Sequence, residues 1–117
     1  MTPETDCLFC RISSGDVPSR NVYSDDRIFA FEDINPQAPR HILICPREHL
    51  ATLNDVAPRH EALMGHVVRV AADLAKKAGD ADAGYRLVAN CQAGAGQSVF
   101  HIHFHLLGGR SFHWPPG

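Results

Sequence analysis

The sequence has little net charge, few cysteines and no long hydrophobic run among its 117 residues. A formal net charge of -2 provides no basic stripe for duplex phosphates, so we expect no nucleic-acid binding. No apolar stretch is long enough to cross a bilayer, so we expect no membrane association. Residues 1–7 lack the basic-then-apolar pattern of a secretory signal, which favours a cytoplasmic protein with reduced thiols.

The composition is that of an ordinary globular protein, with 44% hydrophobic and 21% charged residues. The length suits a single domain with one core over residues 1–117. Residues 1–6 are polar and are expected to be disordered.

A long amphipathic helix is the clearest predicted element. Apolar residues recur at three- and four-residue steps between residues 58 and 78, and Gly79 follows as a typical C-terminal cap. Two histidines of this segment, His60 and His66, are expected to face solvent. The other predicted elements are a helical turn over residues 8–14 and strands over residues 21–24, 27–34, 41–45, 85–91 and 100–107. This pattern predicts an α+β fold with about five mainly antiparallel strands, one long helix and one short helix.

Residues 101–106 read His-Ile-His-Phe-His-Leu, the most informative segment of the chain. In a strand, alternate side chains share a face, so His101, His103 and His105 would lie about 6 to 7 Å apart along one surface. Three such imidazoles can surround a phosphate. They can also hold a catalytic metal ion with water in an open position, and a solvated strand face without function is a third interpretation.

A glycine-rich loop over residues 93–98 precedes these histidines. Gly94 and Gly96 leave backbone N–H groups unobstructed, and Gln97 and Ser98 add an amide and a hydroxyl donor. Such a loop is by itself more often a simple connection between strands. Its place directly before three alternating histidines favours a phosphate site.

Residues 96–107 together resemble the signature of the histidine-triad (HIT) superfamily. Residues 31–41 and the tail 108–117 look like the Hint branch, the purine nucleoside phosphoramidases, and the resemblance runs from about Cys7 to Gly117. It implies a HIT-like fold and a homodimer whose sheet continues across the interface. It also implies hydrolysis of purine nucleoside 5′-phosphoramidates and related adenylates, such as AMP joined to an amine or to lysine, to a nucleoside monophosphate.

The resemblance implies roles for individual residues. His103 would be the nucleophile and would form a covalent nucleotidyl-histidine intermediate that water cleaves. Asp33 would receive the ribose hydroxyls, and Trp114 would reach the partner's active site from a tail over residues 110–117. The implied catalytic residues are His103, His105, His41 and Ser98; the implied substrate-binding residues are Leu8, Phe9, Ile12, Phe31, Asp33, Ile34, Leu43, Asn90, Gly96, Gln97, Ser98, His103, His105 and Trp114.

Cys7 and Cys10 form a second motif. A redox pair is expected at the start of a helix that follows a strand, and no strand is predicted before these cysteines. A structural zinc ion requires four nitrogen or sulfur ligands. The resemblance to cysteine-bearing microbial HIT proteins implies that His49 and His101 complete a structural Zn²⁺ site, with no cofactor required for the chemistry. Two free thiols without a metal are the alternative.

The intact histidines and Ser98 favour an enzyme. A nucleotide-binding regulatory or interaction module with incidental hydrolase activity is the alternative function.

Overall fold

The computed structural model describes residues 6–117, so the disorder expected for residues 1–6 falls almost entirely outside the described part. The elements follow the order α1 (Leu8–Ser14), β1 (Asn21–Ser24), β2 (Ile28–Glu32), β3 (Arg40–Pro46), α2 (Glu61–Ala78), β4 (Tyr85–Ala89) and β5 (Phe104–Gly108). Short 3-10 turns lie at Leu53–Asp55, Pro58–His60 and Ala93–Ala95. None of the helices in the described part has the length and apolarity needed to traverse a bilayer.

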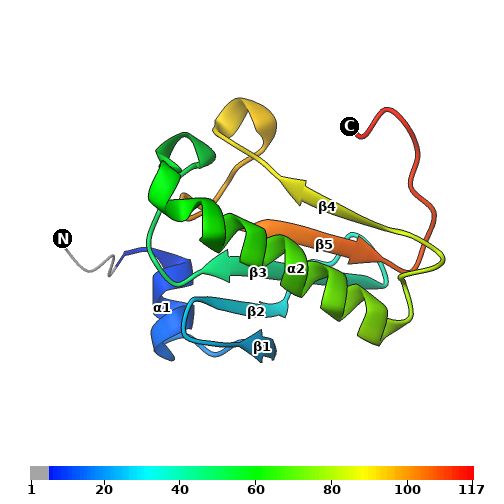
Figure 1. Ribbon diagram of the computed structural model, residues 1–117, viewed down its shortest axis with the longest axis horizontal. Helices are drawn as coiled ribbons and strands as arrows, with labels where there is room; N and C mark the ends of the chain where they lie inside the picture. Colours follow the sequence, from blue (N-terminus) through cyan, green and yellow to red (C-terminus); the bar gives the residue numbers. More distant parts are fainter. Residues whose placement is uncertain (1–5) are drawn as a thin grey trace.

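The five strands form one sheet in the order β1-β2-β3-β5-β4, and every neighbouring pair is antiparallel. The long helix α2 runs across one face of this sheet, and α1 lies at the end of the strands near β2 and β3 (Figure 1). This architecture confirms the α+β fold with five antiparallel strands, one long helix and one short helix. The sheet order leaves β4 at one edge.

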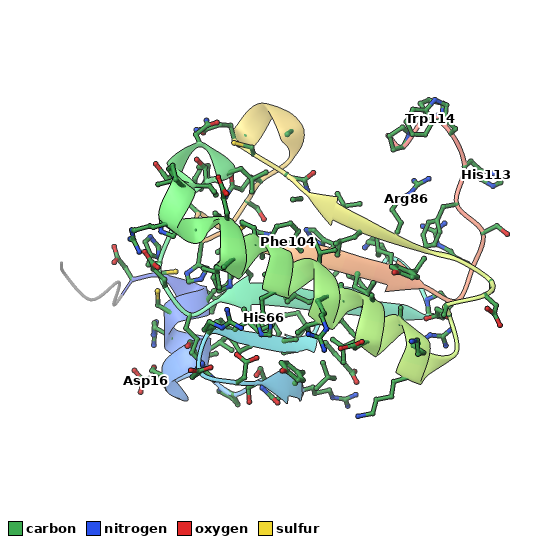
Figure 2. All side chains as sticks on the ribbon, viewed as in Figure 1. Asp16, His66, Arg86, Phe104, His113 and Trp114 are labelled. Atoms are coloured by element: carbon green, nitrogen blue, oxygen red, sulfur yellow. The ribbon has the colours of Figure 1, made fainter. Side chains whose placement is uncertain are left out.

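Alternating side chains give the sheet two buried faces. On one face, Ile28, Ala30, Ile44 and Leu106 pack against the apolar side of α2, and Phe104 lies beneath that helix (Figure 2). The opposite face holds a second cluster. Its members are Phe9 of α1, Phe29 and Phe31 of β2, and Leu43 and Cys45 of β3. The histidine-bearing side of β5 belongs to this second face.

The helix α2 begins later than predicted, because residues 58–60 form a 3-10 turn before Glu61. Gly79 ends the helix with a φ of 85°, as its C-cap position requires. The expectation that His60 and His66 face solvent is wrong. His60 is buried, accepts from the Ala57 N–H and lies 3.0 Å from Glu48, while His66 Nε2 lies 2.6 Å from Asp25 Oδ2. Helical periodicity identifies the apolar side but not the loops that meet its flanks.

Strand β5 begins at Phe104, so the strand predicted over residues 100–107 is too long at its start. The pairing of β5 with β3 ends at Phe104 opposite Ile44. Beyond this point Pro46 offers no N–H to a ladder, and its carbonyl accepts from the ring of His101. The chain before Phe104 instead bonds elsewhere, with the Ile102 N–H donating to Leu50 O at 2.7 Å.

Candidate active site and metal-ligand cluster

A cavity of about 290 Å³ opens beside α1, on the sheet face that carries the histidines. We call it the apolar pocket, since aliphatic and aromatic side chains make most of its wall. It contains ten of the predicted site residues, namely Leu8, Phe9, Ile12, Phe31, Asp33, Ile34, Leu43, Ser98, His103 and His105. It also contains Val17, Pro18, Ser19, Glu32 and Val99, which sequence reasoning did not single out. Nothing in the sequence pattern marks the first three as pocket residues, because they follow α1 in an irregular segment.

Four predicted substrate-binding residues lie outside the pocket lining: Asn90, Gly96, Gln97 and Trp114. Asn90 is half-buried just past the end of β4. Trp114 is 85% exposed on the C-terminal tail, which leaves the sheet at the end away from α1 (Figure 2). Arg86 of β4 anchors this tail by donating to His113 O at 2.9 Å. Ile34 lines the pocket but is 99% exposed, so it lies at the rim.

Gln97 is buried inside the glycine-rich loop. Its Nε2 donates to Ala51 O at 2.8 Å and to Val99 O at 3.1 Å, and its Oε1 accepts from the Gln92 N–H at 2.8 Å. Both amide hydrogens are therefore used within the protein. Gly96 precedes it with a φ of 97°, a left-handed conformation that disfavours any residue with a Cβ. In this structure the Gln97 side chain fixes the shape of the loop that carries Ser98.

His103 is held in one tautomer by the backbone. Its Nδ1 donates to the carbonyl of His101 at 2.8 Å, so the neutral ring carries its lone pair on Nε2. The ring is buried and meets the edge of Phe9 at a centroid distance of 4.9 Å. A neutral imidazole with an unprotonated nitrogen on a pocket wall can act as a nucleophile.

His105 and His41 form a hydrogen-bonded chain beside it. The Gln37 N–H donates to His41 Nδ1 at 3.0 Å, which places the proton of neutral His41 on Nε2. That nitrogen lies 2.9 Å from His105 Nδ1 and 3.4 Å from Asp33 Oδ2. His105 therefore accepts on Nδ1 and carries its proton on Nε2. The His105 ring therefore has a donor nitrogen, and its centroid lies 5.1 Å from that of the His103 ring.

Burial, with smaller contributions from the neighbouring His103 and His41, lowers the pKa of His105 to about 4 against an opposing effect of Asp33. Burial likewise lowers the pKa of His41, against an opposing effect of Asp33. Both rings are therefore neutral near pH 7. The site can present N–H donors and a lone pair without a fixed positive charge on these two rings.

The side chains of Cys7, Cys10, His49 and His101 converge on one point, and we call them the Cys2His2 cluster. Cys10 Sγ lies 3.3 Å from His49 Nδ1 and 3.4 Å from His101 Nδ1, and the two ring nitrogens are 3.2 Å apart. Ligand atoms around a tetrahedral zinc ion stand about 3.3–3.8 Å apart, as follows from its usual bond lengths. The cluster therefore has the size and the donor set of a metal site.

His101 is oriented for such a site. Its Nε2 donates to Pro46 O at 2.7 Å, which leaves a lone pair on Nδ1 facing the cysteines. Burial lowers the pKa of this ring to about 4, so that the lone pair is available. Asp33, His41 and His105 form a second group of potential ligands among residues 6–117, and His103 belongs to neither group. The three alternating histidines thus do not surround one ion, which contradicts the interpretation as a catalytic three-histidine metal centre.

The chain is similar to known proteins in sequence and in fold. A family model described as the HIT domain matches residues 14–112. The purine nucleoside phosphoramidase of Escherichia coli strain K12 is 49% identical over 110 residues, which cover 94% of this chain and 91% of that protein. A HIT family hydrolase from Legionella pneumophila has a TM-score of 0.94 at 50% identity, over 95% of this chain and 99% of that one. A histidine triad protein from Clostridium difficile has a TM-score of 0.91 at 39% identity, over 96% and 97% of the two chains.

Proposed function

The chain belongs to the HIT domain family of hydrolases, and from this premise we propose that it hydrolyses purine nucleoside 5′-phosphoramidates and related adenylates. The proposed reaction passes through a covalent nucleotidyl-histidine intermediate on His103 and releases a nucleoside monophosphate. The relative from Escherichia coli, named as a purine nucleoside phosphoramidase, supports this choice of substrate.

The observation that carries the proposal is the pair of opposite tautomers at the pocket wall. The lone pair of His103 Nε2 and the N–H of His105 Nε2 are fixed by hydrogen bonds to their other ring nitrogens. A nucleophile and a hydrogen-bond donor are what attack on a phosphoryl group requires, because negative charge grows on its oxygens as the new bond forms.

The proposed first step forms a bond between His103 Nε2 and the α-phosphorus and breaks the bond from phosphorus to the leaving amine. The electron pair of the broken bond stays on the amine nitrogen, which takes up a proton. The Ser98 hydroxyl, exposed on the pocket wall, and the neighbouring histidines form the proposed proton route. Water then attacks phosphorus, the bond to His103 breaks, and the nucleoside monophosphate leaves.

The apolar pocket is the proposed site of the purine base. Phe9, Phe31 and Leu43 give it flat and aliphatic walls suited to a heteroaromatic ring. Asp33 lines the same cavity, and its Oδ1 accepts from the Asn35 N–H at 2.8 Å. This bond orients the carboxylate, which we assign to the ribose hydroxyls.

We further propose that the metal of the Cys2His2 cluster is a structural Zn²⁺, since two thiolates and two imidazoles form a typical tetrahedral zinc set. The bound ion would supply a crosslink between α1 and the segment before β5, and no catalytic step. Thiolate ligands require a reducing compartment, so the cytoplasm is the proposed location.

A homodimer is the proposed assembly. Strand β4 is one of the two edge strands of the sheet, and Tyr85 at its start is 38% exposed. Pairing of β4 with a second copy would continue the sheet across the interface. The exposed Trp114 of the neighbouring tail would then reach toward the partner's active site.

The replacement His103→Ala tests the proposed function. It should lower kcat for adenosine 5′-phosphoramidate by at least ~10⁴-fold, because no other group offers the attacking lone pair. Binding of AMP, measured by calorimetry, should persist and show that the variant is folded. Wild-type protein quenched in alkaline denaturant, which preserves the acid-labile P–N bond, should carry AMP on His103 by mass spectrometry, and a variant of full activity would contradict the mechanism. If the inactive variant rescued a deletion phenotype, nucleotide binding would be the function that matters.

A further inference from the structure

A second cavity of about 430 Å³ adjoins the apolar pocket. Leu8, Ser98 and Val99 line both cavities, so these three residues form the wall between them. We call the second cavity the Asp6 cavity, after the carboxylate at its edge.

The apolar pocket leaves little space for a leaving group larger than ammonia. Its volume of about 290 Å³ lies just below the usual range of small-ligand pockets, ~300–1,000 Å³, and we have assigned it to the base, ribose and phosphate. His103 and His105 hold the phosphate from one side of this pocket. Ser98 contributes its hydroxyl at the wall, so a phosphate in contact with Ser98 has the Asp6 cavity as its neighbouring free space.

The Asp6 cavity has the chemistry of a site for a cationic amine. Asp6 is exposed and negatively charged near pH 7, and the Phe100 ring is 43% exposed. Leu8, 45% exposed, adds an aliphatic surface. A carboxylate and an aromatic face attract an ammonium group, and the aliphatic surface accommodates its alkyl stem. Cys7 and His49 of the Cys2His2 cluster also line this cavity, and its described lining contains no lysine or arginine to attract an anionic leaving group such as a second phosphate chain.

We infer that the Asp6 cavity is the leaving-group subsite and that it selects amines bearing a second positive charge. This inference rests on the proposed function and concerns the part of the substrate that the nucleotide site does not contact. Asp6 would bind the distal ammonium group, and Phe100 would cover the stem.

The test compares two substrates that share the AMP moiety. One is adenosine 5′-phosphoramidate, whose leaving group is ammonia, and the other is AMP joined through a P–N bond to 1,5-diaminopentane. We expect a higher kcat/KM for the diamine substrate in the wild-type protein. In Asp6→Asn the ratio of the two kcat/KM values should fall about three- to tenfold, and less at high salt, as befits one partly exposed charge contact. Phe100→Ala should lower the same ratio.

The matched control is Asp16→Asn, which removes the same charge at an exposed position beyond α1 (Figure 2). Its ratio should equal that of the wild-type protein. An unchanged ratio in both Asp6→Asn and Phe100→Ala, or an equal fall in Asp16→Asn, would overturn the inference.

A binding measurement separates this inference from the proposed reaction. In the His103→Ala background, the dissociation constants of the two uncleaved substrates should differ, and Asp6→Asn should reduce that difference. If the two constants are equal in His103→Ala while the wild-type protein cleaves both substrates, the subsite is ruled out and the proposed function stands. If the constants differ but the wild-type protein cleaves neither substrate, the subsite stands and the proposed function is ruled out.

Discussion

The Cys2His2 cluster and the catalytic pair use the same side chain in opposite ways. His101 donates from Nε2 to Pro46 O and presents Nδ1 to the cysteines. His103, two residues on, donates from Nδ1 to His101 O and keeps Nε2 for the pocket. The two rings donate to different backbone carbonyls, and so they present opposite nitrogens. The role of each histidine therefore follows from its backbone acceptor and not from its place in the repeat.

The two regions also share structural parts. Phe9 lies between the two cysteines in sequence, and its ring meets His103 at 4.9 Å and His101 at 6.1 Å. The His101 carbonyl that fixes the nucleophile belongs to a residue of the cluster. We therefore expect damage at the cluster to appear mainly as lost stability, with a smaller effect on turnover.

Removal of the metal site should have the largest effect, and that effect should fall on stability more than on turnover. The double replacement Cys7→Ser and Cys10→Ser should abolish zinc binding and lower the free energy of unfolding by several kcal/mol, ~10 kcal/mol at most. kcat should fall only about tenfold, because the nucleophile remains but its support is looser. Zinc content by atomic emission and denaturant unfolding measure the two effects.

The control for that prediction is Cys91→Ser, a half-buried cysteine outside the cluster. It should keep its zinc and nearly all of its stability. Full zinc content in the double variant would show that the cluster is not the metal site.

Replacement of Gln97 distinguishes a loop brace from a phosphate ligand. Gln97→Met keeps the size of the side chain but leaves the Gln92 N–H and the Ala51 and Val99 carbonyls without their partner. The expected loss is ~2–3 kcal/mol of unfolding free energy, or roughly 10 °C in midpoint. The exposed Gln37→Met serves as the comparison and should cost little. A large loss of AMP affinity in stable Gln97→Met protein would instead support direct contact with phosphate.

The smallest predicted effect concerns pH. Since the pKa of His105 falls from 6.5 to about 4 on folding, the unfolded chain binds more protons between these values. Stability should therefore decrease as the pH falls from 6.5 toward 4, and this group should contribute no further change below that. In His105→Asn the loss of stability between pH 7 and pH 5 should be smaller than in the wild-type protein. Equal losses in thermal unfolding would contradict the assignment.

Much of the fold could be predicted because burial imposes a period on the sequence. The apolar side of α2 recurs with the helical period, and the nearly continuous apolar residues of β2 and β3 belong to strands that are buried on both faces. The start of β5 could not be predicted, since it depends on the missing N–H of Pro46, a residue on a different strand. The same limit explains His60 and His66, whose partners Glu48 and Asp25 lie in distant loops.

The candidate site could likewise be predicted only in part from the sequence. The family motif and the apolar pattern located most of the pocket, including Phe9, Asp33 and His103. The tautomers of His103 and His105 could not be predicted from the sequence, because they depend on backbone carbonyls and N–H groups that any residue carries. Gln97 stays a predicted substrate-binding residue, and nothing in the sequence indicates that its own loop uses both amide hydrogens.

The contact between Cys7 and His101 joins residues 94 positions apart in the chain. During synthesis both cysteines are made well before His101, so the cluster cannot close until residue 101 has left the ribosome. Until then α1 lacks its partner His101, and its thiols remain accessible to competing metals and oxidants. Formation of the cluster therefore waits for a segment that is synthesised much later than α1.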